Sequence, residues 1–218
     1  MDLLPLFPLD TVLFPGTPLT LHIFEPRYRQ MMRRCLEEGL PFGVVLIREG
    51  VEALGPLARP HEIGCTARIT RVEPLDDGRM NILAVGDERF RIEKLRSDEP
   101  YLVGEVAMSP LPEPEDSPAI EGTADALRGL LATYLAALAR ASEGDIGPIE
   151  LPEEPLALAY LAAWVLQVPA SQKQPLLVSR DAAELLARLR ELYRNELPLL
   201  ETMIEHRGRR QSGPFSLN

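Results

Sequence analysis

Cysteine and histidine are scarce in this sequence of 218 residues, which contains two cysteines and three histidines. Cys35 and Cys65 are too few for the disulfide framework of a small secreted domain, and they do not have the spacing of a paired-cysteine zinc site. We interpret both as ordinary buried thiols, because free cysteine behaves as a small hydrophobic residue. His22, His61 and His206 are never three or four residues apart, so the sequence predicts no metal site.

Long hydrophobic runs and an excess of basic residues are also absent. No apolar run reaches the ~18 residues of a membrane span, and no basic stretch precedes an apolar one near residue 1. We therefore expect a cytoplasmic protein with no membrane partner. The formal net charge of -10 disfavours binding to the phosphates of nucleic acid.

Motifs for nucleotide chemistry are missing too. No glycine-rich loop ending in Gly-Lys-Ser or Gly-Lys-Thr occurs, and neither of the two lysines, Lys94 and Lys173, follows a glycine. The sequence therefore predicts no phosphate-binding loop, no cofactor and no catalytic residue.

The most distinctive pattern lies in the first forty residues. Prolines restrict residues 5–18 to extended, edge-strand or turn geometry, and Phe14-Pro15-Gly16 is typical of a turn. Alternating apolar residues then predict a half-buried strand over 19–24. Pro26 suits the first position of a helix, which we expect over 26–38. Its apolar stripe contains Tyr28, Met31, Met32, Cys35 and Leu36.

The rest of the first half favours short strands. Alternation and turn residues predict strands at 42–48, 64–73, 80–85, 88–95 and 101–108, with a hairpin turn at Asp76-Asp77-Gly78. One helix inserted early among short strands is typical of a small, mostly antiparallel β-barrel, closed or half closed. We therefore predict an α+β protein with this barrel at residues 1–110.

The second half has the period of helices. Residues 109–118 contain four prolines and three acids, so we interpret them as a semi-rigid linker. Helical periodicity follows, and it predicts a C-terminal α-helical bundle over 119–208 and a flexible tail over 209–218. Within this bundle we expect four helices: one with an apolar stripe from Leu127 to Leu138 that ends at Gly144, one over 156–168, a short one capped by Ser171 and a long one over 181–206.

Several segments together resemble one family. The run L-P-L-F-P-L-D-T-V-L-F-P-G, followed by the F-E-P-R-Y that ends at Tyr28, closely resembles the N-terminal, substrate-recognition domain of Lon proteases. Two later segments agree: the strand that starts at Gly64, and Gly86-Asp87-Glu88-Arg89-Phe90-Arg91-Ile92, which resembles a hairpin of that family. The resemblance covers roughly residues 3–200, and it is closer still to small bacterial proteins that consist of that domain alone.

The resemblance implies a PUA-like barrel that handles protein substrates. The loop with which Lon hydrolyses ATP has no counterpart here, and neither lysine has a serine context like that of the Lon peptidase site. The family thus implies a non-enzymatic module that binds unfolded or partly folded protein or peptide segments, with a protease or chaperone as a further partner. The alternative is an RNA-binding protein, because the Lon N-terminal fold resembles the PUA domains that bind RNA.

A candidate binding surface lies around the helix at 26–38. Arg27 and Arg29 stand at its positive end, where they oppose the helix dipole, which suggests a role other than helix stability. The alternative is that Arg27 and Tyr28 bind backbone carbonyls of the barrel and fix the helix. The functional hypothesis is an apolar groove rimmed by arginine, because flexible methionines suit varied peptide partners. The candidate peptide-binding residues are Phe14, Phe24, Arg27, Tyr28, Met31 and Met32.

Overall fold

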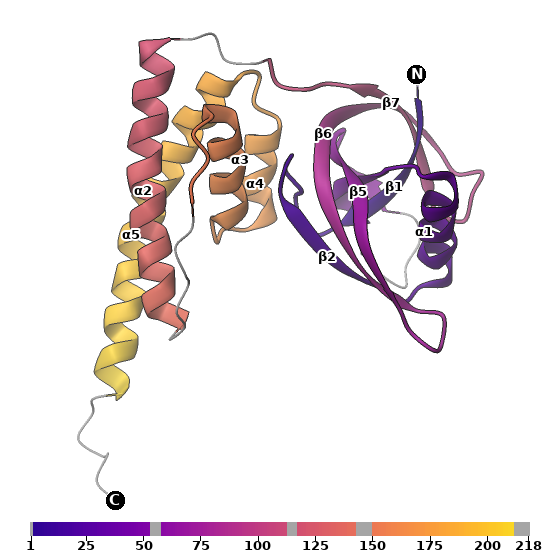
Figure 1. Ribbon diagram of the computed structural model, residues 1–218, viewed down its shortest axis with the longest axis horizontal. Helices are drawn as coiled ribbons and strands as arrows, with labels where there is room; N and C mark the ends of the chain where they lie inside the picture. Colours follow the sequence, from indigo (N-terminus) through magenta and orange to yellow (C-terminus); the bar gives the residue numbers. More distant parts are fainter. Residues whose placement is uncertain (1, 53–57, 113–116, 143–149, 212–218) are drawn as a thin grey trace, which may run out of the picture. The chain divides into compact units, whose positions relative to one another are not determined.

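The computed structural model describes residues 2–52, 58–112, 117–142 and 150–211, and within them the chain forms seven strands and five helices (Figure 1). The chain divides into two units. The sheet unit comprises Met1–Pro112 and Ala163–Arg180, and the helical unit comprises Glu113–Ala162 and Asp181–Asn218. An α+β class is therefore confirmed.

A single sheet contains all seven strands that the structure describes. Its strands are β1 (Asp2–Leu9), β2 (Pro18–Ile23), β3 (Phe42–Glu49), β4 (Arg59–Pro60), β5 (Ile63–Pro74), β6 (Met80–Arg96) and β7 (Leu102–Met108). The order is β1-β7-β6-β5-β3-β4, and β2 pairs with β6. β1 also pairs with β3, in parallel, whereas the strands that are neighbours in this order and the β2–β6 pair are antiparallel.

The proline-rich start of the chain forms strand β1. β1 is antiparallel to β7 from Asp2 to Leu6, and parallel to β3 from Leu6 to Leu9. Because β1 changes partner at Leu6, each half of this strand pairs along one side only. A proline is tolerated in such a strand, since the donor that it lacks can fall on the unpaired side. The change of partner explains how Pro5 and Pro8 fit within one strand.

Strand β6 corrects one sequence-based prediction. The segment that begins at Gly86 was expected to be a hairpin, but β6 is continuous from Met80 to Arg96. Gly86 instead marks a close approach of the turn at Phe14: its N–H donates to Thr17 O at 3.0 Å, and a Cβ at this position would collide with Phe14 O. The glycine is therefore needed for packing between β6 and the turn.

Helix α1 (Pro26–Glu38) begins and ends as the sequence predicts. It begins with Pro26 at its first turn and ends at Gly39, which has the left-handed φ of 66° that favours glycine at a helix C-terminus. In Figure 1 the strands curve strongly and α1 lies along one side of them. Four residues of the predicted apolar stripe, Tyr28, Met31, Met32 and Cys35, join the main core with apolar side chains of the strands, whereas Leu36 is exposed.

Both cysteines are buried in this core and free, as predicted. Burial raises the pKa of the Cys35 thiol from 9.0 to about 11 and that of Cys65 to about 12. Each thiol has a higher pKa in the folded state than in the unfolded chain. The stabilising contribution of the two thiols is therefore fully present below pH 9. This contribution is lost as the pH rises from 9 through these values.

We expect the free energy of unfolding to fall between about pH 8 and pH 10.5, partly because of these two thiols. Chemical denaturation at both pH values measures this loss. The double variant Cys35→Ala/Cys65→Ala should lose less stability over the same interval. An equal loss in parent and double variant would contradict the assignment to cysteine.

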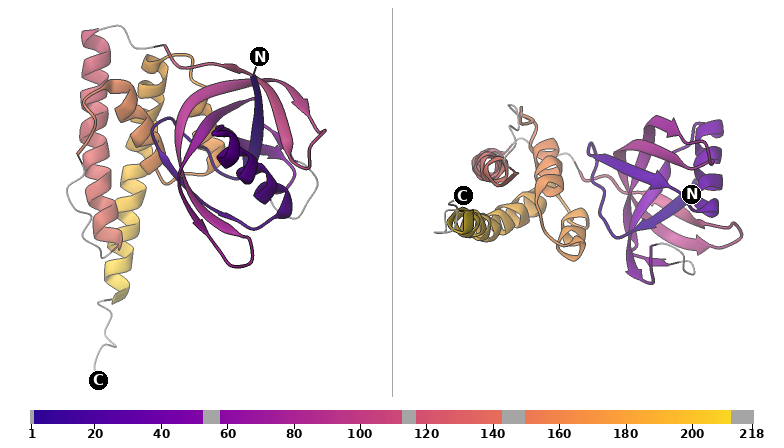
Figure 2. Two further views of the ribbon diagram at one scale, coloured as in Figure 1. Left: turned by 45° about the vertical axis from the view of Figure 1, so that its right-hand side comes forward. Right: turned by 90° about the horizontal axis from the view of Figure 1, so that it is seen from below.

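The helices of the second half are α2 (Pro118–Ser142), α3 (Pro155–Val165), α4 (Ala170–Leu177) and α5 (Ala182–Gln211). α2 and α5 run side by side in the views of Figures 1 and 2. Glu154 caps α3, because its carboxylate accepts the Leu156 N–H at 2.7 Å. α3 ends three residues earlier than expected. Ser171 lies inside α4 rather than at a capping position, since the N-cap is Pro169 and has no side-chain hydrogen bond.

The division into units differs from the domain boundaries expected from the sequence. Residues 163–180, expected in the bundle, group with the sheet unit. Two buried hydrogen bonds explain this: Gln174 Nε2 donates to Ile63 O and Arg89 donates to Ser179 O, both at 2.9 Å. A flexible tail was expected over 209–218. Its first three residues belong to α5, which extends to Gln211, and the other residues lie outside the described ones.

In the described part of the chain, no helix is both long and apolar enough to span a membrane.

Candidate functional site

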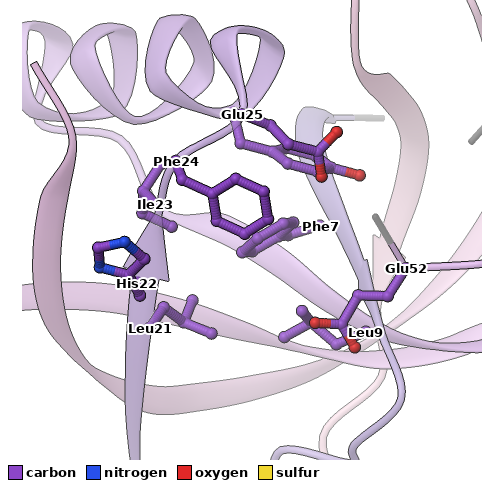
Figure 3. A pocket seen from close by; sticks show the side chains of 9 residues that line it. Phe7, Leu9, Leu21, His22, Ile23, Phe24, Glu25 and Glu52 are labelled. Carbon is purple, nitrogen blue, oxygen red and sulfur yellow. The ribbon is translucent and has the colours of Figure 1, made fainter. Parts of the chain in front are cut away.

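A small cavity opens on the sheet unit where β2 leads into α1. Its volume is about 50 Å³. Apolar side chains form most of its wall, together with two carboxylates and one imidazole. The lining residues are Phe7, Leu9, Leu21, His22, Ile23, Phe24, Glu25, Tyr28 and Glu52. We call it the Phe24 cavity (Figure 3).

Four segments of the chain build this cavity: β1, β2 with the connection after it, the first turn of α1, and the residues after β3, which carry Glu52. β1 contributes Phe7 and Leu9, which lie on the same side of the strand because side chains alternate. β2 contributes Leu21 by the same alternation, and the connection after it carries Phe24 and Glu25. Pro26 starts α1 at once, and the first turn of that helix places Tyr28 against Phe7.

Aromatic rings form the centre of the wall. The centroids of Phe7 and Tyr28 lie 4.1 Å apart, with the rings tilted. Phe24 stacks on His22 with a centroid separation of 6.0 Å, and 43% of Phe24 is exposed. Figure 3 shows Phe24 beside Phe7, with His22 on one side and Glu25 and Glu52 on the other. Phe24 therefore offers an accessible aromatic surface at the opening of the cavity.

The two carboxylates of the cavity have different partners. Glu25 is buried and forms an ion pair with Arg27 at 2.9 Å. Glu52 Oε2 accepts the Asp10 N–H at 2.9 Å, and Glu52 has no basic partner within the described residues. The charge of Glu25 is therefore neutralised by Arg27, whereas Glu52 gives the cavity a negative charge.

His22 is held in a polar network at the edge of the cavity. Its Nδ1 lies 2.7 Å from Asn81 Oδ1, and its Nε2 lies 3.5 Å from an Arg79 nitrogen. Because the amide oxygen can only accept, Nδ1 carries the hydrogen, and Nε2 of the neutral ring accepts from Arg79. The network holds the imidazole plane against Phe24.

Three of the six predicted binding residues have no exposed surface. Phe14, Met31 and Met32 are fully buried, so the prediction that they line an open groove is wrong. The physical reason is that the stripe of α1 packs against the strands of the sheet unit, and Phe14 lies in the turn that contacts Gly86. Of the predicted set, the structure brings Phe24 and Tyr28 together in the cavity, with Arg27 beside them.

The arginines of α1 contact the protein itself. Arg27 lies over the Tyr28 ring, 4.8 Å from its centroid, in addition to its pair with Glu25. Arg29 donates to Asp77 O at 3.1 Å, so it ties α1 to the β5–β6 turn. Arg34 contacts Glu38, Glu99 and the Tyr101 hydroxyl. The alternative hypothesis gave such backbone contacts to Arg27 and Tyr28, whereas the contact with Asp77 O is made by Arg29, which that hypothesis did not include.

A second cavity, of about 180 Å³, lies near the C-terminal end of α1. Ion pairs rim it, from Arg34 to Glu99 at 3.6 Å and from Arg96 to Asp98 at 3.0 Å. Its charges are therefore paired. The lining residues are Leu3, Pro5, Arg34, Leu40, Arg96, Asp98, Glu99 and Val103.

The described residues contain no group of three or more His, Cys, Asp or Glu side chains placed to hold a metal ion.

Sequence reasoning missed Phe7, Leu9 and Glu52 as members of the cavity. Phe7 and Leu9 alternate along an extended segment, which is a usable signal for a shared face. Glu52 has no such signal, because only the tertiary structure brings the residues after β3 beside β1.

The fold and the comparisons define a substrate-binding class of domain. The profile of the ATP-dependent protease La (LON) substrate-binding domain matches residues 3–195. The chain therefore belongs to the LON substrate-binding domain family, which confirms the resemblance noted in the sequence.

Individual relatives agree with this family. A Lon protease of Methylocella silvestris is 29% identical over 191 residues, covering 84% of this chain and 23% of the relative. Lon protease 2 of Herpetosiphon aurantiacus is 30% identical over 212 residues, covering 93% of this chain and 25% of the relative. The chain thus spans about a quarter of the length of these relatives. The crystal structure of a Lon N-terminal domain protein from Xanthomonas campestris is similar with a TM-score of 0.65 and 29% identity, covering 87% of this chain and 97% of that one.

Proposed function

We propose that this chain is a non-enzymatic module that recognises unfolded or partly folded protein segments, and that the Phe24 cavity holds one side chain of the bound segment. The observation that carries the proposal is an open, mainly apolar cavity beside an exposed phenylalanine, in a domain of a substrate-binding family. Its volume suits a single side chain rather than a folded surface.

The physical chemistry of the cavity supports a polypeptide ligand. Apolar walls stabilise a bound apolar or long side chain by removing it from water. Unfolded segments present such side chains, whereas folded proteins bury most of them. The strand pairings lead from β1 through β7, β6, β5 and β3 back to β1, which supports the interpretation of the sheet as a PUA-like barrel.

Electrostatics favour a peptide over RNA, the alternative function for a PUA-like fold. The lining contains two carboxylates and no lysine or arginine, and nucleic-acid sites need basic residues that pair with phosphates. A nucleic acid would therefore meet the wrong sign of charge at the Phe24 cavity.

Replacing Phe24 by alanine should weaken binding of an unstructured apolar peptide about tenfold, because a large aromatic anchor is lost. Fluorescence anisotropy with a labelled peptide measures the affinity. The melting temperature should change little, since Phe24 is 43% exposed.

Leu95→Ala provides the matched control, because Leu95 is equally exposed and lies outside both cavities. Equal affinities of the Phe24→Ala variant and the parent chain would contradict the proposed site.

The purified chain should hydrolyse neither ATP nor casein. The reason is that the sequence contains no phosphate-binding loop of the Gly-Lys-Ser/Thr type and no lysine in the serine context of the Lon peptidase. A coupled phosphate-release assay and a labelled casein assay measure the two activities. Hydrolysis of ATP or casein that remains with this chain through successive purification steps would contradict the non-enzymatic assignment.

A further inference from the structure

The Tyr28 hydroxyl is a buried polar group for which the described residues provide no hydrogen-bond partner. Tyr28 is only 4% exposed, and its hydroxyl makes no hydrogen bond within the described part of the chain. Tyr28 is one of the residues that line the Phe24 cavity. Buried hydroxyls normally have a partner, and leaving one unpaired costs free energy. A ligand in the Phe24 cavity can supply the missing hydrogen bond.

Glu52 is a second group in the same cavity that can bind a ligand. One of its carboxylate oxygens accepts from the Asp10 N–H, while no cation neutralises the charge among the residues that the structure describes. Burial is the main cause that raises the pKa of Tyr28, and the charges of Glu25 and Glu52 raise it further against the opposing effect of Arg27. Tyr28 and Glu52 both line the Phe24 cavity, so a ligand bound there would meet both groups.

Together these groups define the chemistry of the ligand. A carboxylate and a phenolic oxygen both accept hydrogen bonds, so the matching group is a cation with several donors. Phe24 and Phe7 add aromatic faces that attract a cation, and Leu9 and Leu21 suit an aliphatic stem. A compact ammonium on an unbranched chain fits about 50 Å³ better than a planar guanidinium, which needs room for its fork.

We propose that the Phe24 cavity is a lysine-selective subsite, in which the ammonium of a substrate lysine binds the Glu52 carboxylate and the Tyr28 hydroxyl while its aliphatic stem lies against Phe24 and Leu9. This inference rests on the proposed function and specifies its substrate: an unfolded segment that carries a lysine among apolar residues. The acidic net charge of the chain, -10, favours the approach of such segments over acidic ones.

The test uses the 218-residue chain and three short, unstructured, fluorescently labelled peptides of the same apolar sequence. The first has one central lysine and an acetylated amino terminus, and the second has norleucine in its place. The third has norleucine and a free amino terminus. Anisotropy titrations should give the lysine peptide about tenfold higher affinity than either norleucine peptide, because a hydrogen bond to a charged group is gained. Added salt should reduce this difference.

Two conservative variants locate the effect. Tyr28→Phe and Glu52→Gln should each remove most of the preference for lysine and leave the affinity for norleucine unchanged. Tyr28→Phe should also keep the melting temperature, because the lost hydroxyl has no partner within the described residues of the folded chain. Glu37→Gln is the matched control, since Glu37 is exposed on α1 and lies outside the cavity. It should retain the full preference.

The outcomes separate this inference from the proposed function. Equal binding of the lysine peptide and the acetylated norleucine peptide to the parent chain would overturn lysine selectivity and leave peptide binding in place. Tight binding of the peptide with the free amino terminus would assign the subsite to chain termini and also overturn it. If none of the three peptides binds, the proposed function itself is contradicted. A preference that survives in both cavity variants would show that the lysine binds elsewhere.

Discussion

Replacing Met32 by aspartate should lower the melting temperature of the chain by roughly 10 °C or more. The Met32 side chain has no exposed surface and packs in the core between α1 and the strands. A carboxylate there loses its water and gains no cation, which costs about 4 kcal/mol or more of folding free energy. Thermal melting followed by circular dichroism measures the effect.

Leu36→Asp provides the matched control for this prediction. Leu36 lies four residues further along α1, and 42% of it is exposed. An aspartate there keeps its water, so it should cost a few tenths of a kcal/mol through the unfavourable helix dipole. A Met32→Asp variant as stable as the Leu36→Asp variant would mean that the stripe of α1 faces solvent, as the groove hypothesis required.

Replacing Gly64 by alanine should destabilise the chain by about 1–3 kcal/mol, because the added methyl overpacks the core. A Cβ at Gly64 would lie 2.5 Å from Val44 O, 2.6 Å from Val45 Cγ1 and 2.7 Å from Phe90 Cζ. The oxygen belongs to the backbone of β3, so it can move only if the pairing of β3 and β5 shifts. Equilibrium denaturation in urea measures the loss as a lower midpoint.

Replacing Gly129 by alanine should have the opposite effect and stabilise the chain. Gly129 lies inside α2, and a Cβ there meets nothing within 4 Å. Alanine is the better helix former by about 0.5–1 kcal/mol, so this variant should raise the urea midpoint. If Gly64→Ala and Gly129→Ala shift the urea midpoint in the same direction and by the same amount, the close packing around Gly64 does not explain why a glycine is needed there.

The local elements could be predicted from the sequence because their signals are local. Pro26 and Gly39 bound α1, the spacing of Met31, Met32 and Cys35 marks its apolar stripe, and the turn at residues 76–78 separates two strands. The failures involve groups that are distant in sequence. β6 passes through Gly86 without a turn, since the glycine is required by the approach of the Phe14 backbone and not by a positive φ.

Which face of α1 meets solvent could not be predicted in the same way. An apolar stripe has the same spacing whether it packs into a core or lines a groove, so the pattern could not place Met32 inside. Phe24 follows an alternating strand, and its exposure depends on where β2 ends and α1 begins. Glu52 joins the cavity only because β1 and β3 are parallel neighbours, which brings the end of β3 beside Asp10.

The sequence by itself determined the family, the α+β class, the bounds of α1 and the free, buried state of both cysteines, because motifs, periodicity and helix caps act over a few residues. Only the tertiary structure decided that the methionines are core and that residues 163–180 group with the sheet unit. It also decided that Tyr28, Phe24 and Glu52 share one cavity. Burial and the meeting of distant side chains depend on strand pairing and helix docking, which no local pattern of residues specifies.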